Sequence, residues 1–206
     1  MIKTLIIDGN NLFKIGFHGV RDYFHNGKHI GGTWHFINTI RRFIEDYNYD
    51  KVVVFWDGDS NSSARKTIYP QYKEHRRNDM NEFKMDSFQE QKERVKQYLE
   101  EMFVRQVLID NNEADDLIAY YCQISENEHK TIFSGDKDLT QLISDKVTIY
   151  SPSTKQYYRD GDTIKVYDAE IPHYNVKTLK IITGDGSDNI VGIFYMGEKT
   201  LLKFFP

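Results

Sequence analysis

The chain has 206 residues, 39% of them hydrophobic and 28% charged, which supports a folded core and excludes a chain that is disordered in bulk. Its length suits one α/β domain, or one domain plus the start of another. A single cysteine excludes an internal disulfide and fits a reducing compartment. No apolar run approaches the roughly 20 residues of a membrane span, and a strand follows Met1 almost at once. We therefore expect a cytoplasmic protein without a signal peptide or membrane segment.

The net charge of −4 hides a local contrast. Residues 65–77 hold five basic residues against one acidic residue, a local charge of +4, so the rest of the chain carries −8. A basic segment on an acidic body can bind a polyanion locally, and the acidic excess needs an explanation of its own.

Strands and helices alternate along the sequence. Short apolar runs predict strands over 4–7, 51–56, 107–109, 131–133 and 147–150. Helical periodicity predicts helices over 33–47 with Thr33 as N-cap, over 82–105, and over 114–122. Residues 12–32 have no assigned structure, residues 58–81 break the pattern, and residues 157–174 are expected to be irregular. The pattern predicts an α/β fold with a doubly wound, mostly parallel sheet flanked by helices.

Acidic residues follow the ends of these predicted strands. Asp8, Asp57 and Asp136 each follow a strand closely, and Glu113 lies just beyond another. Because ligands bind beyond the carboxyl ends of the strands in such sheets, we expect these acids to converge on one rim.

The helix over 114–122 begins with three carboxylates, on Glu113, Asp115 and Asp116. They allow two interpretations. Acids in a first turn favour the positive end of the helix dipole, and Asn112 can cap the helix. They can also form part of a functional site. Helix geometry places Glu113 and Asp116 on one face and Asp115 about 100° away, so not all three need contact the same ligand.

Nine carboxylates are expected at this rim: Asp8, Asp57, Glu113, Asp115, Asp116, Asp136, Asp138, Asp185 and Asp188. They would repel one another and be driven to protonate unless cations lay among them. Oxygen ligands suit Mg²⁺, or Mn²⁺ as a substitute, and the number is sufficient for two ions. A pair of metal ions is a known arrangement for phosphodiester cleavage.

The basic segment also has two interpretations. A charged run is often no more than a solvated loop. Here Arg65, Lys66, Lys73, Arg76 and Arg77 flank tyrosines that include Tyr72, as expected of a surface that follows single-stranded phosphates and stacks on bases. Together with the carboxylates, this segment points to a nucleic-acid phosphodiesterase.

Six motifs in order along the chain resemble the signature blocks of the 5′-nuclease family, the 5′→3′ exonucleases and flap endonucleases of bacteriophages and of bacterial polymerase I. They are Ile7-Asp8-Gly9-Asn10-Asn11, Trp56-Asp57-Gly58, residues 69–76, Glu113-Ala114-Asp115-Asp116, residues 134–138 and residues 184–189. The resemblance implies a PIN-like fold over residues 1–190, a helical arch or clamp over 58–105, and a truncated helix-hairpin-helix-type duplex-binding segment over 191–206. It also implies Mg²⁺ dependence and cleavage of 5′-ended branched DNA or RNA-primed DNA. Nothing in the sequence suggests more than a monomer, and replication proteins are candidate further partners.

The resemblance assigns roles to individual residues. Asp8, Asp57, Glu113, Asp115 and Asp116 would supply the first metal site, and Asp136, Asp138, Asp185 and Asp188 the second, with Asp136 shared. Lys73 and Arg76 would hold the scissile phosphate, and Tyr72 would pack against a base. Lys14, Arg65, Lys66, Arg77, Gly192, Gly197 and Lys199 are further candidates for DNA contact. The family's hairpin after the last acidic block often holds a K⁺ ion, but this chain has Tyr195 where a glycine is usual.

Two other functions are compatible with parts of the sequence. A PIN-type ribonuclease shares the sheet and some acids, but it needs neither the basic arch nor the pair Asp185 and Asp188. A non-catalytic, structure-specific DNA-binding protein would lack metal ligands, whereas all nine positions are acidic here. We expect Asp136→Ala or Lys73→Ala to cripple turnover and leave the fold intact.

Overall fold

The computed structural model describes residues 1–21, 23–75, 82–166 and 169–201. Six strands form the central sheet in the order β5-β4-β1-β6-β7-β8. Their bounds are β1 (Ile2–Asp8), β4 (Lys51–Asp57), β5 (Arg105–Ile109), β6 (Glu128–Phe133), β7 (Val147–Ser151) and β8 (Gln156–Tyr158). The first five are parallel, and β8 pairs antiparallel with β7. The predicted α/β fold with a mainly parallel sheet is confirmed.

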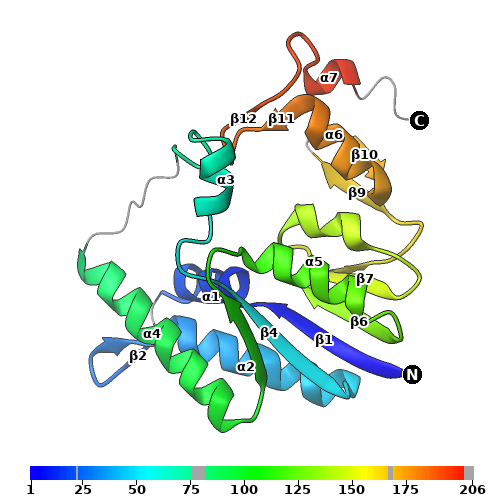
Figure 1. Cartoon of the computed structure of the whole chain (residues 1–206). Coiled ribbons are helices and arrows are strands. Elements are labelled where there is room, and N and C mark those ends of the chain that lie inside the picture. Colours follow the sequence, from blue (N-terminus) through cyan, green and yellow to red (C-terminus); the bar gives the residue numbers. More distant parts are fainter. Residues whose placement is uncertain (22, 76–81, 167–168, 202–206) are drawn as a thin grey trace.

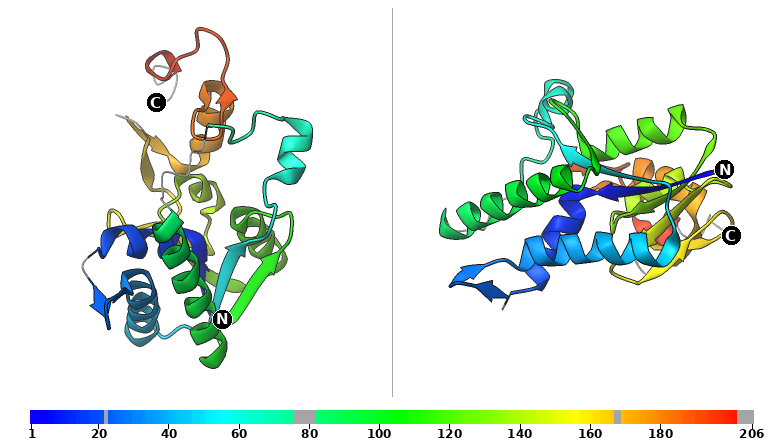
Figure 2. Two further views of the ribbon diagram at one scale, coloured as in Figure 1. Left: turned by 90° about the vertical axis from the view of Figure 1, so that its left-hand side faces the viewer. Right: turned by 90° about the horizontal axis from the view of Figure 1, so that it is seen from below.

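Helices cover both faces of the sheet (Figures 1 and 2). One face packs against α1 (Gly9–Gly19), α2 (Gly31–Tyr47) and α4 (Glu82–Glu101). The other face packs against α5 (Ala114–Ile124), η1 (Lys137–Leu142) and α6 (Val176–Thr183).

The central strands are apolar on both sides because both faces are buried. In β1, Leu5 and Ile7 point into the core under α1, α2 and α4, whereas Ile6 points into the core under α5. All three are at most 1% exposed. Packing on both faces therefore fixes the position of β1. The residue at the carboxyl end of the strand is held in place as a consequence.

The remaining elements are short. They are β2 (Phe24–His25), β3 (Lys28–His29), α3 (Ser63–Ile68), β9 (Thr163–Val166), β10 (Ala169–Pro172), η2 (His173–Asn175), β11 (Gly184–Asp185), β12 (Ile190–Val191) and α7 (Glu198–Leu201). Figure 1 shows α3 away from the sheet and beside β11 and β12. The predicted arch, residues 58–105, thus includes α3 and α4, and the predicted duplex-binding segment begins in β12.

Two local predictions are wrong. Residues 157–174 are not irregular, because most of them lie in β8, β9, β10 and η2. Thr33 is not a helix N-cap, because α2 begins two residues earlier at Gly31. The Thr33 hydroxyl instead donates to the carbonyl of Gln91 in α4, so the residue helps to join two helices. Tertiary contacts decided both cases.

Within the described ranges, none of the helices combines the length and the apolar character needed to cross a membrane.

Candidate metal centre

Two strand ends bring the first carboxylates together. Asp8 is the last residue of β1 and Asp57 the last of β4, and these strands are direct neighbours. Glycine follows each acid because there is no room for a side chain. A Cβ at Gly9 would lie 2.6 Å from the Trp56 ring, and one at Gly58 would lie 2.0 Å from the Ile109 carbonyl oxygen. These close approaches fix where the chain leaves the sheet.

Backbone amides hold several of the carboxylates in orientation. Asp8 Oδ1 accepts a hydrogen bond from the Asn11 amide at 2.9 Å, and Asp8 Oδ2 accepts one from the Ser134 hydroxyl at 2.9 Å. Asp136 Oδ1 accepts from the Asp138 amide at 2.8 Å, which caps η1. Each acid therefore also ends a strand or begins a helix, so the fold itself sets its position.

Asp57 caps the acidic helix. Its Oδ1 accepts from the Ala114 amide at 2.9 Å, at the start of α5. The predicted cap, Asn112, instead donates its side-chain amide to the carbonyl of Asp110. A side chain therefore caps this helix, as predicted, but the capping residue is Asp57 and not Asn112. Because the cap comes from β4, the first turn of α5 is tied to the end of the sheet.

The carboxylates line one polar cavity of about 190 Å³. Its lining comprises Asp8, Asn10, Asn11, Lys14, Asp57, Lys73, Glu113, Asp115, Asp136, Asp138, Lys180, Ser187 and Asp188. Seven of the nine predicted acids therefore meet in one space, although they span 180 residues of sequence. Lys14, at the exposed side of α1, lies at the same cavity.

Burial, with repulsion from neighbouring acids, raises the pKa of three acids that line the cavity: Asp8, Asp115 and Asp138. Burial, together with the charges of Asp8, Asp136, Asp57 and Glu113, raises the pKa of Asp115 to about 8. Burial also raises the pKa of Asp8 to about 6, although hydrogen bonds from Asn11 and Ser134 act in the opposite direction. This part of the cavity concentrates more negative charge than its protein neighbours neutralise.

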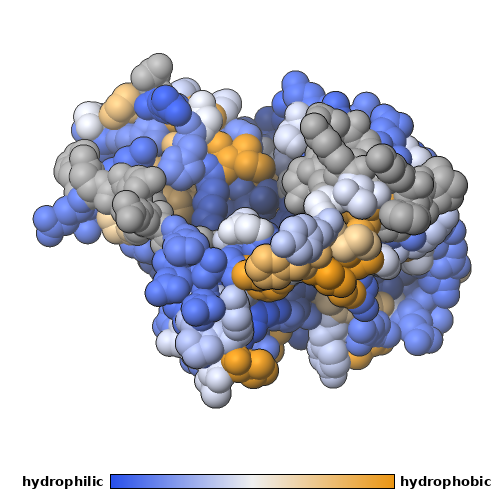
Figure 3. All heavy atoms as spheres, turned by 90° about the horizontal axis from the view of Figure 1, so that it is seen from above, coloured by the Kyte–Doolittle hydropathy of each residue, from blue (hydrophilic) through white to orange (hydrophobic). Residues whose placement is uncertain are grey.

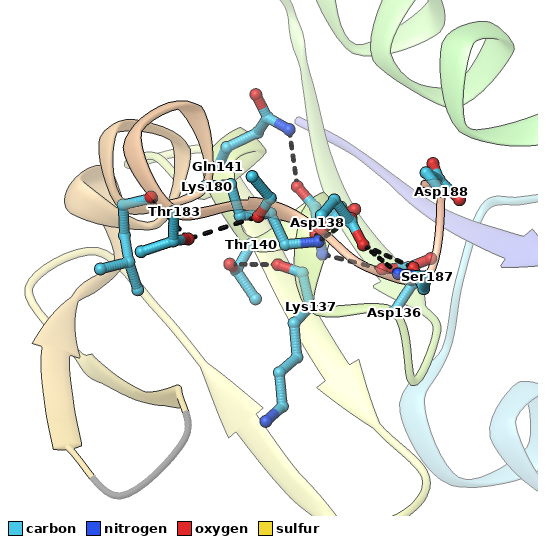
Figure 4. A network of polar contacts seen from close by, with 12 residues as sticks. Asp136, Lys137, Asp138, Thr140, Gln141, Lys180, Thr183, Ser187 and Asp188 are labelled. Carbon is cyan, nitrogen blue, oxygen red and sulfur yellow. Dashed lines mark hydrogen bonds and ion pairs between the residues drawn. The ribbon is translucent and has the colours of Figure 1, made fainter. Parts of the chain in front are cut away.

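A second part of the cluster has a cation of its own (Figure 4). The Lys180 ammonium, on α6, pairs with Asp138 Oδ1 and lies 2.8 Å from Asp185 Oδ2. Asp185 Oδ1 accepts hydrogen bonds from the Ser187 amide at 2.9 Å and the Ser187 hydroxyl at 2.6 Å. Burial alone would raise the pKa of Asp185, but Lys180 and Ser187 outweigh burial and lower it to about 2.

Residues 69–73 lie across the cluster. The Lys73 ammonium lies 2.7 Å from Glu113 Oε1, and the Lys73 amide donates to the Asp188 carbonyl. The Tyr72 hydroxyl lies 3.2 Å from Glu113 Oε1 and 3.1 Å from Asp188 Oδ2. Tyr69 and Asn189 add two further bonds between the segments. The base of the arch is therefore joined directly to the acidic loop after β11.

Tyr72 is not available for base stacking in this arrangement. It is 4% exposed, and the cations of Lys73 and Arg65 lie 4.8 Å and 5.6 Å from its ring centroid. Burial and the charges of Glu113 and Asp188 raise the pKa of its hydroxyl, so it remains a hydrogen-bond donor. The structure gives Tyr72 a supporting position behind the carboxylates instead.

Asp116 lies on the other side of the acidic helix. It pairs with Arg65 Nη2 at 2.7 Å, while Arg65 Nη1 lies 3.2 Å from Glu113 Oε2. The predicted geometry of the helix is confirmed: Glu113 and Asp116 share one neighbour, whereas Asp115 faces the other acids of the polar cavity.

A larger cavity of about 730 Å³ adjoins this side, lined by Arg65, Ile68, Tyr69, Ala119, Leu142, Ile190 and Val191 among others. Seen from above, the molecule is hollowed between two lobes, with hydrophobic residues beside the hollow (Figure 3).

The other predicted DNA-contact residues are spread more widely. Lys66 is exposed on α3. Gly192 packs against the backbone of α6, where a Cβ would lie 2.2 Å from the Thr183 carbonyl carbon. Among the residues that the structure describes, none lies within 4 Å of a Cβ built at Gly197. Arg76 and Arg77 lie outside the described residues, as does the side chain of Lys199.

A known family matches most of the chain. The family described as 5′-3′ exonuclease, N-terminal resolvase-like domain, matches residues 3–170. The chain belongs to this 5′-3′ exonuclease family. A 5′-3′ exonuclease of Halalkalibacterium halodurans is 32% identical over 96% of the chain and 67% of its own length.

Relatives and a solved structure support this membership. DNA polymerase I of Bacillus subtilis is 26% identical over 98% of the chain, which spans 23% of that relative's length. A solved structure of T5 5′-exonuclease with bound divalent metal ions (zinc) has a TM-score of 0.81 at 25% identity. The match covers 98% of this chain and 74% of the T5 5′-exonuclease chain. The fold of this family member therefore matches that of T5 5′-exonuclease.

The donor set of this exonuclease-family chain fits divalent metal in its chemistry. Every acid in the cavity offers oxygen, which hard divalent cations prefer, and the raised pKa values of Asp8 and Asp115 show a demand for positive charge. As the described side chains are arranged, no three His, Cys, Asp or Glu residues lie close enough to hold one ion. The ammonium groups of Lys73 and Lys180 contact some of these carboxylates instead.

Several residues of the site were not identified from sequence. Asn10, Ser187 and Lys180 line the cavity, Asn11 Oδ1 accepts from the Gly135 amide at 2.9 Å, and Ser134 bonds Asp8. Four of these are polar residues inside the recognised motifs, so their position beside an acid was an available signal. The sequence offered no such signal for Lys180, because only the packing of α6 brings this lysine to Asp138.

Proposed function

We propose that this chain is a Mg²⁺-dependent nuclease. It hydrolyses phosphodiesters at the 5′ ends or 5′ flaps of branched DNA, or of RNA-primed DNA, during replication and repair, and it acts in the cytoplasm as a monomer. The observation that carries the proposal is the cavity in which seven acids from distant parts of the sequence meet, two of them with strongly raised pKa values. The chain's family membership agrees with this chemistry.

The carboxylates divide between two proposed metal sites. Asp8, Asp57, Glu113 and Asp115 would hold the first ion, with Asp116 at its margin and Asp136 shared between the two ions. Asp138, Asp185 and Asp188 would hold the second. Two divalent ions in such a site supply an activated water and stabilise the charge on the leaving oxygen, and Mn²⁺ can replace Mg²⁺.

The protein's own cations would position the substrate. Lys73 has 17% of its side chain exposed and lies at the cavity, next to Glu113. From there its ammonium can exchange the carboxylate for a phosphate oxygen and stabilise the charge that develops on it. We assign the same role to Arg76, which lies outside the described residues, and we assign Lys14 and Lys66 contacts with the flanking phosphates.

The experiment is an incubation of the chain with a 5′-flap duplex, labelled at the 5′ end of the flap, in Mg²⁺ and separately in EDTA. We expect a released oligonucleotide in Mg²⁺ only. Lys73→Ala should lower the cleavage rate about 100-fold, by analogy with loss of one charge-stabilising donor. Lys3→Ala, which removes an exposed lysine at the opposite end of β1 from Asp8, is the matched control and should change the rate little.

Other outcomes of this assay would change the proposal. Release of mono- or dinucleotides would mean that the exonuclease mode dominates. Binding of the flap duplex without cleavage in either Mg²⁺ or Mn²⁺ would contradict a nuclease and favour the DNA-binding protein.

A further inference from the structure

Lys180 lies where a metal ion would have to lie to bridge two acids of the cluster. Its ammonium pairs with Asp138 Oδ1 and is 2.8 Å from Asp185 Oδ2 (Figure 4). Asp138 comes from η1 and Asp185 from β11, which follows α6 directly, and Lys180 lies on α6 itself, five residues before Asp185. The contact is thus set by the packing of α6 on η1, not by a long side chain reaching from a loop.

The contact also uses the oxygens that a metal ion would need. Asp185 Oδ2 faces Lys180, and Asp185 Oδ1 accepts two hydrogen bonds from Ser187. Asp185 therefore has both oxygens engaged, and its side chain is only 17% exposed. An ammonium and a divalent cation cannot contact the same pair of carboxylate oxygens at once, because their charges repel and their positions coincide.

The other acids of the cavity present a different picture. Among the described contacts, Asp115 has no basic partner and is surrounded by the charges of Asp8, Asp57, Asp136 and Glu113. Lys73 contacts Glu113 at the margin of this group. Two neighbouring groups of carboxylates at this cavity thus differ in whether a lysine lies between the acids.

We propose that Lys180 is an internal counter-ion that competes with divalent metal for Asp138 and Asp185. In the DNA-free protein the first metal site binds an ion readily, while the second binds one only after the Lys180 ammonium has left. The two sites are therefore filled in order, and Lys180 sets the difference between their affinities. This inference rests on the proposed function only in taking the carboxylates as metal ligands.

The test measures Mn²⁺ binding to the DNA-free protein. Isothermal titration calorimetry and the electron paramagnetic resonance signal of free Mn²⁺ are the two readouts. The wild-type chain should bind one ion tightly and a second ion weakly. Lys180→Met keeps the length of the side chain and removes the charge, and it should tighten the second ion by about tenfold or more. Lys180→Arg keeps the charge and should bind Mn²⁺ as the wild type does.

Control variants separate this effect from a general loss of charge or of structure. Lys177→Met removes an exposed lysine from the same helix and should leave the second affinity unchanged. Lys180→Gln can still donate a hydrogen bond to a carboxylate, so it provides a second uncharged variant if Lys180→Met fails to fold. Circular dichroism without metal checks the fold of each variant.

Two outcomes would overturn the inference: a wild-type chain that binds two ions with equal affinity, or a second affinity that both uncharged variants leave unchanged. Neither outcome touches the proposed nuclease activity, which fails only if the wild type does not cleave in Mg²⁺.

Discussion

The carboxylates in and beside the cavity form two groups that differ in how their charge is balanced. In the first group Asp115 and Asp8 are buried among other acids, and the pKa of each is raised, to about 8 and about 6. In the second group Lys180 lies between Asp138 and Asp185, and the pKa of Asp185 is lowered to about 2. One group needs a cation from outside, whereas the other already has one.

The contrast shows that acidic residues in a cluster are not equivalent ligands. The cost of placing carboxylates together depends on burial and on nearby charge. Lys180 and Ser187 lower the pKa of Asp185, whereas at Asp138 burial outweighs the same lysine and the pKa stays raised. Neutralised acids stabilise the fold, while repelled acids weaken it and provide the driving force for binding metal. The following predictions test this difference, from the largest expected effect to the smallest.

Asp115→Asn should have the largest effect on activity, with opposite signs for catalysis and stability. Losing this acid from the first metal site should lower the cleavage rate about 1000-fold, in line with the several kcal/mol that bound metal contributes to such reactions. The same change removes a buried, repelled carboxylate, so the metal-free variant should melt at a higher temperature than the wild type. Flap cleavage and differential scanning calorimetry in EDTA measure the two effects.

Asp110→Asn is the control for this variant. Asp110 is exposed beyond the end of β5 and does not line the polar cavity. It should change neither cleavage nor melting. If Asp115→Asn cleaves at the wild-type rate, Asp115 has no part in the metal centre.

Asp8 and Asp115 on one side and Asp185 on the other should respond to pH in opposite directions. A carboxylate whose pKa is raised on folding binds its proton more tightly in the folded state, so its contribution to stability falls as pH rises from about 4 towards the folded pKa. For Asp8 and Asp115, the melting temperature in EDTA should therefore fall as pH rises through about 6 and about 8. For Asp185, with its lowered pKa, stability should be lost only as pH falls from about 4 to about 2.

Melting curves across this pH range, with and without Mg²⁺, check the prediction. Mg²⁺ binds the ionised acids and should reverse the decline at high pH. In Asp115→Asn the decline between about pH 6 and 8 should disappear. A melting temperature in EDTA that rises with pH over this interval would contradict the repulsion inferred for the first group.

Tyr72→Phe should have the smallest effect of these variants on stability. It tests the link between the two groups of carboxylates, because the Tyr72 hydroxyl contacts both. It lies near Glu113 in the first and near Asp188 in the second. The ring and its contacts with Lys73 and Arg65 remain, so the variant should lose only about 1 kcal/mol of unfolding free energy. Urea denaturation measures this loss, and Tyr174→Phe, an exposed tyrosine, is the control. A loss as large as that of a core deletion would show that the hydroxyl organises the whole cluster.

Local errors in the predictions have a shared physical cause. Asn112 and Thr33 both have the chemistry of a helix cap, yet Asp57 caps α5 from a neighbouring strand and Thr33 bonds to Gln91 in α4. The strands between 156 and 172 were missed because they are short and pair with each other or with β7. Propensity describes a residue and its neighbours in sequence, whereas these elements depend on partners elsewhere in the chain.

The sequence by itself determined that the chain has buried parallel strands followed by acids. From this it determined that the acids converge, because parallel strands end at one edge of a sheet. The motif order was enough to predict the family to which the chain belongs.

Only the tertiary structure decided which acids are repelled and which are paired. Lys180 is near Asp185 in sequence, but it reaches Asp138 only because α6 packs on η1. Asp116 is next to Asp115, but it faces Arg65. Charge and burial act through space, so the chemical state of each carboxylate follows from its three-dimensional neighbours.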